Sequence, residues 1–120
     1  MLSRRLLRIK VAKNLYAHLK SDSTNLKASE KNLIASIDKA YDLYFQMLSL
    51  IVEVARYAES RQEIAKQKKL PTYEDLNPNR RFVDNSVIAL ISNSESVNDE
   101  IATRKISWAN NYDIVKDIYN

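Results

Sequence analysis

Residues 29–69, SEKNLIASIDKAYDLYFQMLSLIVEVARYAESRQEIAKQKK, decide the fold of this chain because neither glycine nor proline interrupts them. Apolar side chains recur at intervals of three or four residues in the first part of the stretch: Leu33, Ile34, Ile37, Tyr41, Tyr44, Leu48, Ile51, Val52 and Ala55. This is the period of an α-helix with one buried face. We therefore predict one long helix over residues 29–69, which Pro71 stops.

The second part of this predicted helix is polar. From Glu59 to Lys69 only Ile64 and Ala65 are apolar. At 1.5 Å per residue the helix spans roughly 60 Å, whereas a compact domain of this size is only about 35 Å across. The polar part is therefore expected to project from the core, to bend, or to contact something outside the core.

The composition of the whole chain favours the same fold class. Its 120 residues include no glycine and only two prolines, so hairpin-rich β architecture is disfavoured. We predict an all-α helical bundle that forms a single domain over residues 1–120. The chain has no cysteine, which is typical of a reducing compartment, and we expect it to be cytoplasmic.

The composition also argues against an enzyme. Phosphate-binding loops need glycine, and thiol nucleophiles and most structural zinc sites need cysteine. The single histidine, His18, lacks the glutamate three residues earlier that di-iron bundles use, because Leu15 stands there. We expect no catalytic residue, no metal, no cofactor and no small-molecule substrate, and therefore a protein that works by binding.

Shorter elements are predicted after the long helix. Residues 70–81 form a loop, in which Thr72 and Asp75 have the spacing of a helix cap. Short helices fill residues 82–120, at about 82–91, 95–108 and from 112 onward, and Trp108 serves as a packing anchor or an interface residue. The last helix has no cap signal before Asn120, so we expect this chain to be the N-terminal portion of a longer protein.

A first helix is predicted from Arg4 to Leu19, with Ser3 as its N-cap and the polar cluster at 21–25 ending it. Its broad apolar face is expected to pack on the core: Leu7, Ile9, Val11, Ala12, Leu15, Tyr16 and Leu19. Arg8 breaks this pattern because it points into the middle of the apolar face. We expect it to overhang the end of the core with its charged head in water.

Positive charge is concentrated in the same helix. Residues 1–21 carry six Lys and Arg and no acid, while the whole chain has a net charge of +4. Arg4, Arg5 and Arg8 lie at the helix start, where the macrodipole disfavours a cation by about 0.3 to 1 kcal/mol. Phosphate reverses this preference, because helix-start N–H groups and guanidinium forks both donate to an anion. We predict that residues 1–20 form a basic helix facing nucleic acid, with Lys10 and Lys13 in support.

Three segments occur in an order that is typical of one protein family. They are Arg4-Arg5-x-x-Arg8-x-Lys-Val-Ala-x-Asn-Leu15-Tyr16-Ala, then Asp42-Leu-Tyr44-Phe45-x-x-Leu48-x-x-Ile51, then LPTYEDLNPNRRFVDN at 70–85. Together they resemble the bacterial transcription antitermination factor NusB. The first is similar to its arginine-rich helix, the second to the helix that opens the second half of its core, and the third to a stretch of its long-form members.

This resemblance implies an all-helical, NusB-like protein that acts in antitermination. Arg4, Arg5 and Arg8 would then contact a single-stranded, boxA-type element of nascent ribosomal RNA. The partners would be the ribosomal protein NusE and the RNA polymerase elongation complex. The family's second helical subdomain, which supplies much of the NusE interface, is not recognisable before residue 120, so it stays open whether this portion binds NusE by itself.

Other interpretations also stay open from the sequence. The chain is alternatively a helical protein-interaction or scaffold module that docks a partner along residues 29–69 and pairs its arginines with acids. A first helix lying on anionic membrane ranks last, because it has no Trp or Phe on its apolar side, and we expect no membrane partner. An arginine-rich, acid-free start also occurs in organelle transit peptides.

Overall fold

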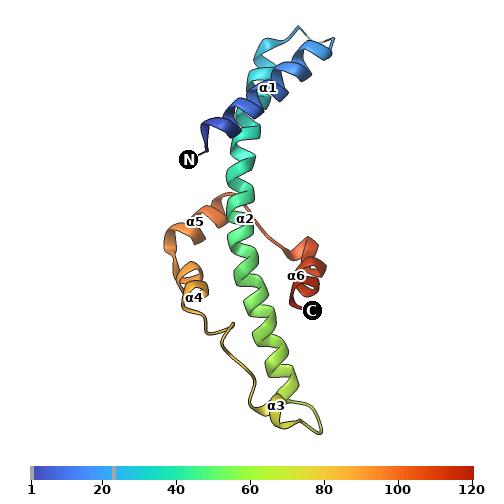
Figure 1. Ribbon diagram of the computed structural model, residues 1–120, viewed down its shortest axis with the longest axis vertical. Helices are drawn as coiled ribbons and strands as arrows, with labels where there is room; N and C mark the ends of the chain where they lie inside the picture. The colour runs from blue at the N-terminus through green and yellow to red at the C-terminus, as the bar shows by residue number, and fades with distance from the viewer. Residues whose placement is uncertain (1, 23) are drawn as a thin grey trace. The chain divides into compact units, whose positions relative to one another are not determined.

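The computed structural model describes residues 2–22 and 24–120, and every regular element within them is a helix. These are α1 (Arg4–Lys20), α2 (Leu26–Lys66), α3 (Tyr73–Leu76), α4 (Ser86–Asn93), α5 (Glu95–Thr103), a 3₁₀ turn (Ala109–Asn111) and α6 (Tyr112–Tyr119), as Figure 1 shows. The predicted all-α class is confirmed. The chain divides into two compact units, unit 1 (Met1–Leu43) and unit 2 (Tyr44–Asn120).

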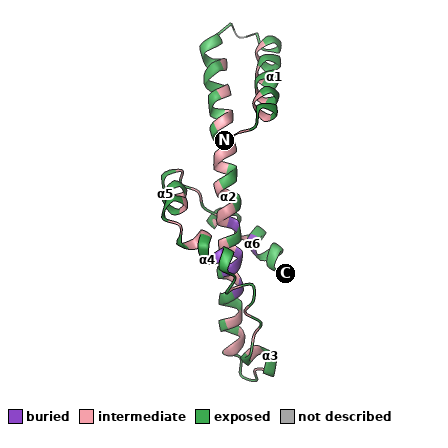
Figure 2. Ribbon diagram, turned by 60° about the vertical axis from the view of Figure 1, so that its left-hand side comes forward, coloured by how far each residue is buried: buried purple, intermediate pink, exposed green. Residues whose placement is uncertain are grey.

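Unit 1 consists of α1 and the first part of α2, which lie side by side in Figures 1 and 2. Ser3 caps α1 as predicted, since its Oγ accepts a hydrogen bond from the backbone N–H of Leu6 at 3.2 Å. The start of α2 is capped by Asn25, whose Oδ1 accepts from the N–H of Ala28 at 3.1 Å. Ser23, in the middle of the polar cluster that was expected to end α1, lies outside the described residues.

The long helix is confirmed, with both of its ends shifted towards the N-terminus. It covers Leu26–Lys66, whereas residues 29–69 were predicted. Its last turn is tightened by bonds that reach back three residues, from Gln67 N–H to Ile64 O and from Lys68 N–H to Ala65 O. The helix therefore ends ahead of Pro71, through its own terminal turn.

The core of unit 2 forms where α6 covers α2. Leu50 and Val54 of α2 pack with Val115 of α6, which is 0 % exposed, and Tyr57, Trp108 and Tyr112 surround them. The Trp108 indole N–H donates to the carbonyl of Gln46 at 3.1 Å, so this residue is a packing anchor. In Figures 1 and 2, α4 and α5 lie on a different side of α2 from α6, and the buried residues gather on α2 near these helices.

The predicted buried face of α2 is wrong in part. Ala55 is buried as expected, but Ile34, Tyr44 and Ile51 are exposed, and Tyr44 retains 58 % of its accessible surface. Leu50 and Val54 form the core in their place. Apolar side chains surround most of this part of α2, so the position of α6, and not the period of α2 alone, selects the face that is buried.

The polar part of α2 is contacted by the segment that follows it. Arg80 makes two bonds to Asp84, both at 2.9 Å, and one to Glu59 of α2 at 3.2 Å. These bonds lower the pKa of the Asp84 carboxyl and raise the pKa of Arg80. Gln62 adds a hydrogen bond to the carbonyl of Asn79. The charged stretch of α2 thus has polar partners within unit 2.

The predicted loop at 70–81 contains the short helix α3. Its capping box is the predicted pair: Thr72 Oγ1 accepts from Asp75 N–H at 3.2 Å, and Asp75 Oδ2 accepts from Thr72 N–H at 3.0 Å. Two hydrogen bonds lower the pKa of the Asp75 carboxyl: the one from Thr72 N–H has the larger effect, and the one from Lys68 Nζ the smaller. Local cap chemistry was therefore strong enough to form a helical turn where only a loop was expected.

The later helices are shorter than predicted. Residues 81–84 form a turn, and α4 starts after Asn85, whose Oδ1 accepts from Val87 N–H at 2.8 Å. Helix α5 ends at Thr103 and not near 108, because Lys105 takes a positive φ of 54° and Ile106 N–H bonds back to Ile101 O. The last helix begins at Tyr112 as predicted.

Candidate nucleic-acid interface

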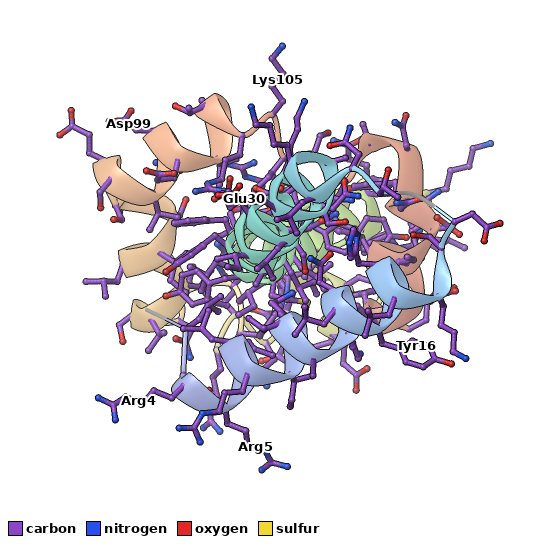
Figure 3. All side chains as sticks on the ribbon, turned by 90° about the horizontal axis from the view of Figure 1, so that it is seen from above. Arg4, Arg5, Tyr16, Glu30, Asp99 and Lys105 are labelled. Carbon is purple, nitrogen blue, oxygen red and sulfur yellow. The ribbon has the colours of Figure 1, made fainter. Side chains whose placement is uncertain are left out.

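The predicted RNA-binding residues lie on α1 in unit 1. Arg4 and Arg5 occupy its first turn, Arg8 follows one turn later, and no acidic residue lies in the first turn. All three arginines are exposed. Within the described residues none of them has an ion pair or a hydrogen bond from its side chain, and Figure 3 shows Arg4 and Arg5 pointing away from the helix. The helix start therefore presents three guanidinium groups to solvent without compensating charge.

The two predicted supporting lysines have different environments. Lys13 is exposed, and its ammonium group has no partner among the described residues. Lys10 is half-buried, and its Nζ donates to the carbonyl and the hydroxyl of Ser36 at 2.8 and 2.9 Å. The structure thus groups Arg4, Arg5, Arg8 and Lys13 on solvent-facing positions and directs Lys10 towards α2.

The predicted core face of α1 is wrong for all of its residues except Leu7, which is half-buried. Val11, Leu15 and Leu19 are exposed, Leu15 at 53 % and Leu19 at 79 %, and no residue of α1 is buried. The side of α1 that meets α2 carries polar residues, including Lys10 and His18. This exposure also accounts for Arg8, which had been expected to overhang a core: the face to which it points is open to solvent.

Tyr16 was likewise predicted to be buried, and it is 65 % exposed. Figure 3 shows its side chain directed away from α1. Tyr16 lies eleven residues after Arg5, which is just over three helical turns, so the two share one face about 16 Å apart along the axis. Tyr16 is therefore a candidate site residue that the sequence did not indicate. Its helical period places it among leucines, and this pattern predicts a buried tyrosine.

The net charge of the two units differs in sign. Unit 1 contains nine Lys and Arg against four Asp and Glu, a balance of +5, while unit 2 contains ten against eleven, a balance of −1. Arg80, in unit 2, is held by carboxylates, whereas the arginines of α1 are not. The uncompensated positive charge of the described chain is thus concentrated around α1.

Two further observations bear on other kinds of site. Within residues 2–22 and 24–120, no group of three or more His, Cys, Asp and Glu side chains is placed to hold a metal ion. Across the same residues, none of the helices combines the length and the apolar character needed to cross a bilayer.

No family model matches this chain, and no curated protein or solved structure matches it. What marks the candidate interface is therefore the charge and the exposure of its own residues.

Proposed function

We propose that this protein binds single-stranded RNA through the exposed face of α1 and acts by binding, without catalysis. The observation that carries the proposal is the set of three exposed arginines, without partners among the described residues, at the positive end of a helix. A helix start without acids has a positive potential from its free N–H groups and its dipole. Phosphate oxygens are the complementary ligands, since arginine forks bind them in a bidentate manner.

The position of Tyr16 supports single-stranded RNA over a duplex. Stacking of an unpaired base on an exposed aromatic ring contributes roughly 1 to 3 kcal/mol per base. Arg5 and Tyr16 lie on one face of α1, so a strand held by its phosphates at the helix start can extend along the helix to the ring. Bases within a duplex are stacked on each other and offer no such contact.

The resemblance of the three segments to NusB gives the proposal its specific form. In that form the RNA is a boxA-type element of a nascent transcript, and the protein acts in transcription antitermination with NusE on the RNA polymerase elongation complex, in the cytoplasm. What supports this step is the sequence of α1, of residues 42–51 and of residues 70–85. The charge and exposure of α1 support RNA binding independently of the family.

Single substitutions test the site. Each phosphate contact to a single strand makes the slope of log K against the logarithm of salt concentration steeper by about 0.7. A slope of that size corresponds to an about fivefold change in affinity between 1 M and 0.1 M salt. We expect Arg5→Ala and Arg8→Ala each to weaken RNA binding about fivefold at 0.1 M salt. Arg61→Ala, which removes an exposed arginine from unit 2, is the matched control and should change little. Unchanged affinity in both α1 variants would remove the basis of the proposal.

A protein-interaction module is the second candidate. A groove in unit 2 is lined by apolar residues of α2, α4 and α5, including Tyr44, Leu48, Leu90 and Val97, and Leu90 is 74 % exposed. Exposed apolar surface of this kind often marks a protein contact. This candidate predicts protein capture that Leu90→Gln abolishes, together with RNA binding too weak to show a salt slope.

A further inference from the structure

A row of polar side chains lines part of the contact between α1 and α2 in unit 1. Three side chains at four-residue spacing on α1, namely Lys10, Asn14 and His18, meet two serines on α2 that are seven residues apart, Ser29 and Ser36. Lys10 Nζ donates to Ser36 O and Oγ at 2.8 and 2.9 Å, and Asn14 Nδ2 donates to Ser29 O at 2.9 Å. His18 Nδ1 lies 2.7 Å from Ser29 Oγ. We call these five residues the polar seam.

No hydrophobic core determines how α1 is rotated on α2. In the described part of unit 1, residues 2–22 and 24–43, no residue is buried. Leu15 and Leu19 remain 53 % and 79 % exposed, although Val11 and Leu15 also line a shallow groove with Leu26 and Leu33 of α2. Burial of apolar surface would by itself favour a rotation that turns Leu15 and Leu19 further towards α2.

That alternative rotation would hide the arginines. Leu15 and Leu19 lie seven and eleven residues after Arg8, which is close to two and three whole turns of helix. All three side chains therefore project from the same face of α1. Turning Leu15 and Leu19 towards α2 necessarily turns Arg8 in the same direction, and an unpaired guanidinium is then either desolvated or displaced.

We propose that the polar seam selects the observed rotation of α1 and thereby keeps the arginine face exposed, with Lys10 as a positioning residue and not a phosphate ligand. Lys10 makes two of the four hydrogen bonds of the seam and is its only ammonium donor, and hydrogen bonds from a charged group are the stronger ones. Its ammonium group is directed into unit 1, away from an RNA bound on the exposed face. The consequence for RNA rests on the proposed function; the rotation itself does not.

The rotation can be measured without RNA, because the chain contains no cysteine. A Leu15→Cys reporter places the only thiol on the exposed face. We expect it to react with a maleimide at the rate of an exposed thiol, and to react at least about fivefold more slowly when Lys10→Met is added, since Leu15 then turns inward. Lys13→Met, at an exposed position without a partner, is the matched control and should leave the labelling rate unchanged. Equal rates in all three proteins would overturn the inference.

A second measurement separates positioning from phosphate contact. Lys10→Met should weaken binding of a short single-stranded RNA roughly tenfold while the slope of log K against log salt stays the same, because the number of phosphate contacts in the bound state does not change. Lys13→Met, if Lys13 contacts phosphate, should lower that slope by about 0.7. A slope that falls equally in Lys10→Met would make Lys10 a phosphate ligand and overturn its positioning role.

Rescue completes the test. In the double variant Lys10→Cys/Ser36→Cys, a short thiol-reactive bridge restores the link between α1 and α2 without restoring the charge. RNA affinity should recover on bridging, relative to the same variant unbridged, and a bridged protein that stays weak would contradict the inference. If the unsubstituted protein binds no RNA, the proposed function fails, while the labelling experiment still decides whether the seam sets the rotation.

Discussion

Replacing Arg5 with glutamate should change stability and RNA affinity in opposite directions. Arg5 lies in the first turn of α1 and is exposed, with no partner among the described residues, so its removal breaks no contact in the protein. Loss of a cation and gain of an anion at a helix start each favour the helix by about 0.3 to 1 kcal/mol. The sum predicts that Arg5→Glu stabilises α1 by roughly 0.6 to 2 kcal/mol.

The same substitution should weaken RNA binding by more than its neutral counterpart. One lost phosphate contact to a single strand corresponds to about fivefold in affinity at 0.1 M salt, and the new carboxylate adds repulsion from the phosphates. We therefore expect a loss greater than about fivefold for Arg5→Glu. The control is Arg61→Glu, which makes the same change of charge at an exposed position of unit 2.

Amide hydrogen exchange and a fluorescence-anisotropy titration measure the two effects. Exchange of the α1 amides should become slower in Arg5→Glu, while the titration with single-stranded RNA shows weaker binding. An α1 that exchanges faster, or an RNA affinity within twofold of the unsubstituted protein, would refute the reasoning that the charge at this helix start is kept for an anion at the expense of stability.

Three further outcomes follow from unit 2. Val115→Ala, at a position that is 0 % exposed, should lower the free energy of unfolding by about 2 to 3 kcal/mol in a urea titration, whereas Val87→Ala at an exposed position of α4 should change it by less than about 0.5 kcal/mol. Lys105→Gly should raise the thermal midpoint by removing the strain of a positive φ of 54° in a residue with a side chain, and Lys105→Ala should not. The cap made by the Asp75 carboxylate should be fully stable above the ordinary carboxyl pKa of about 3.9 and should be lost only as the pH falls further, because the pKa of Asp75 is lowered in the folded chain. NMR signals of residues 72–77, followed from pH 5 to pH 2, should report this loss. A transition centred above pH 4 would contradict it.

Local chemistry was readable from the sequence. Ser3, Thr72 and Asp75 form the predicted caps, and Trp108 is an anchor of the unit 2 core. Each of these depends on a few neighbouring residues or on one large side chain. The ends of α4 and α5 were less predictable, because Lys105 adopts a backbone conformation that a sequence without glycine gives no reason to expect there.

The rotation of α1 could not be predicted from α1 alone. Its apolar period is genuine, but the polar row of Lys10, Asn14 and His18 finds partners on another helix, in Ser29 and Ser36. Only the two rows considered together, one with a spacing of four residues and one with a spacing of seven, would have indicated a polar contact. The same error placed Tyr16 in the core and left an exposed aromatic ring out of the predicted site.

The candidate interface itself was predictable in its charge and not in its geometry. Arg4, Arg5 and Arg8 stand at a helix start without acids, which predicts an anion site, and the structure places them in solvent without partners among the described residues. Lys10 was grouped with them by charge alone. Its bonds to Ser36 show that a lysine in a basic run can serve the protein's own structure.

The most direct test of RNA binding by α1 is a titration of the unsubstituted chain with a short boxA-type single-stranded RNA and with a scrambled RNA, at two salt concentrations, beside the triple variant Arg4→Ala/Arg5→Ala/Arg8→Ala. We predict tighter binding to the boxA-type RNA and a salt slope that falls by about 2 in the variant, for three lost phosphate contacts. Equal binding by the triple variant and the unsubstituted chain, or no binding by either, would contradict the claim that α1 is an RNA-binding surface.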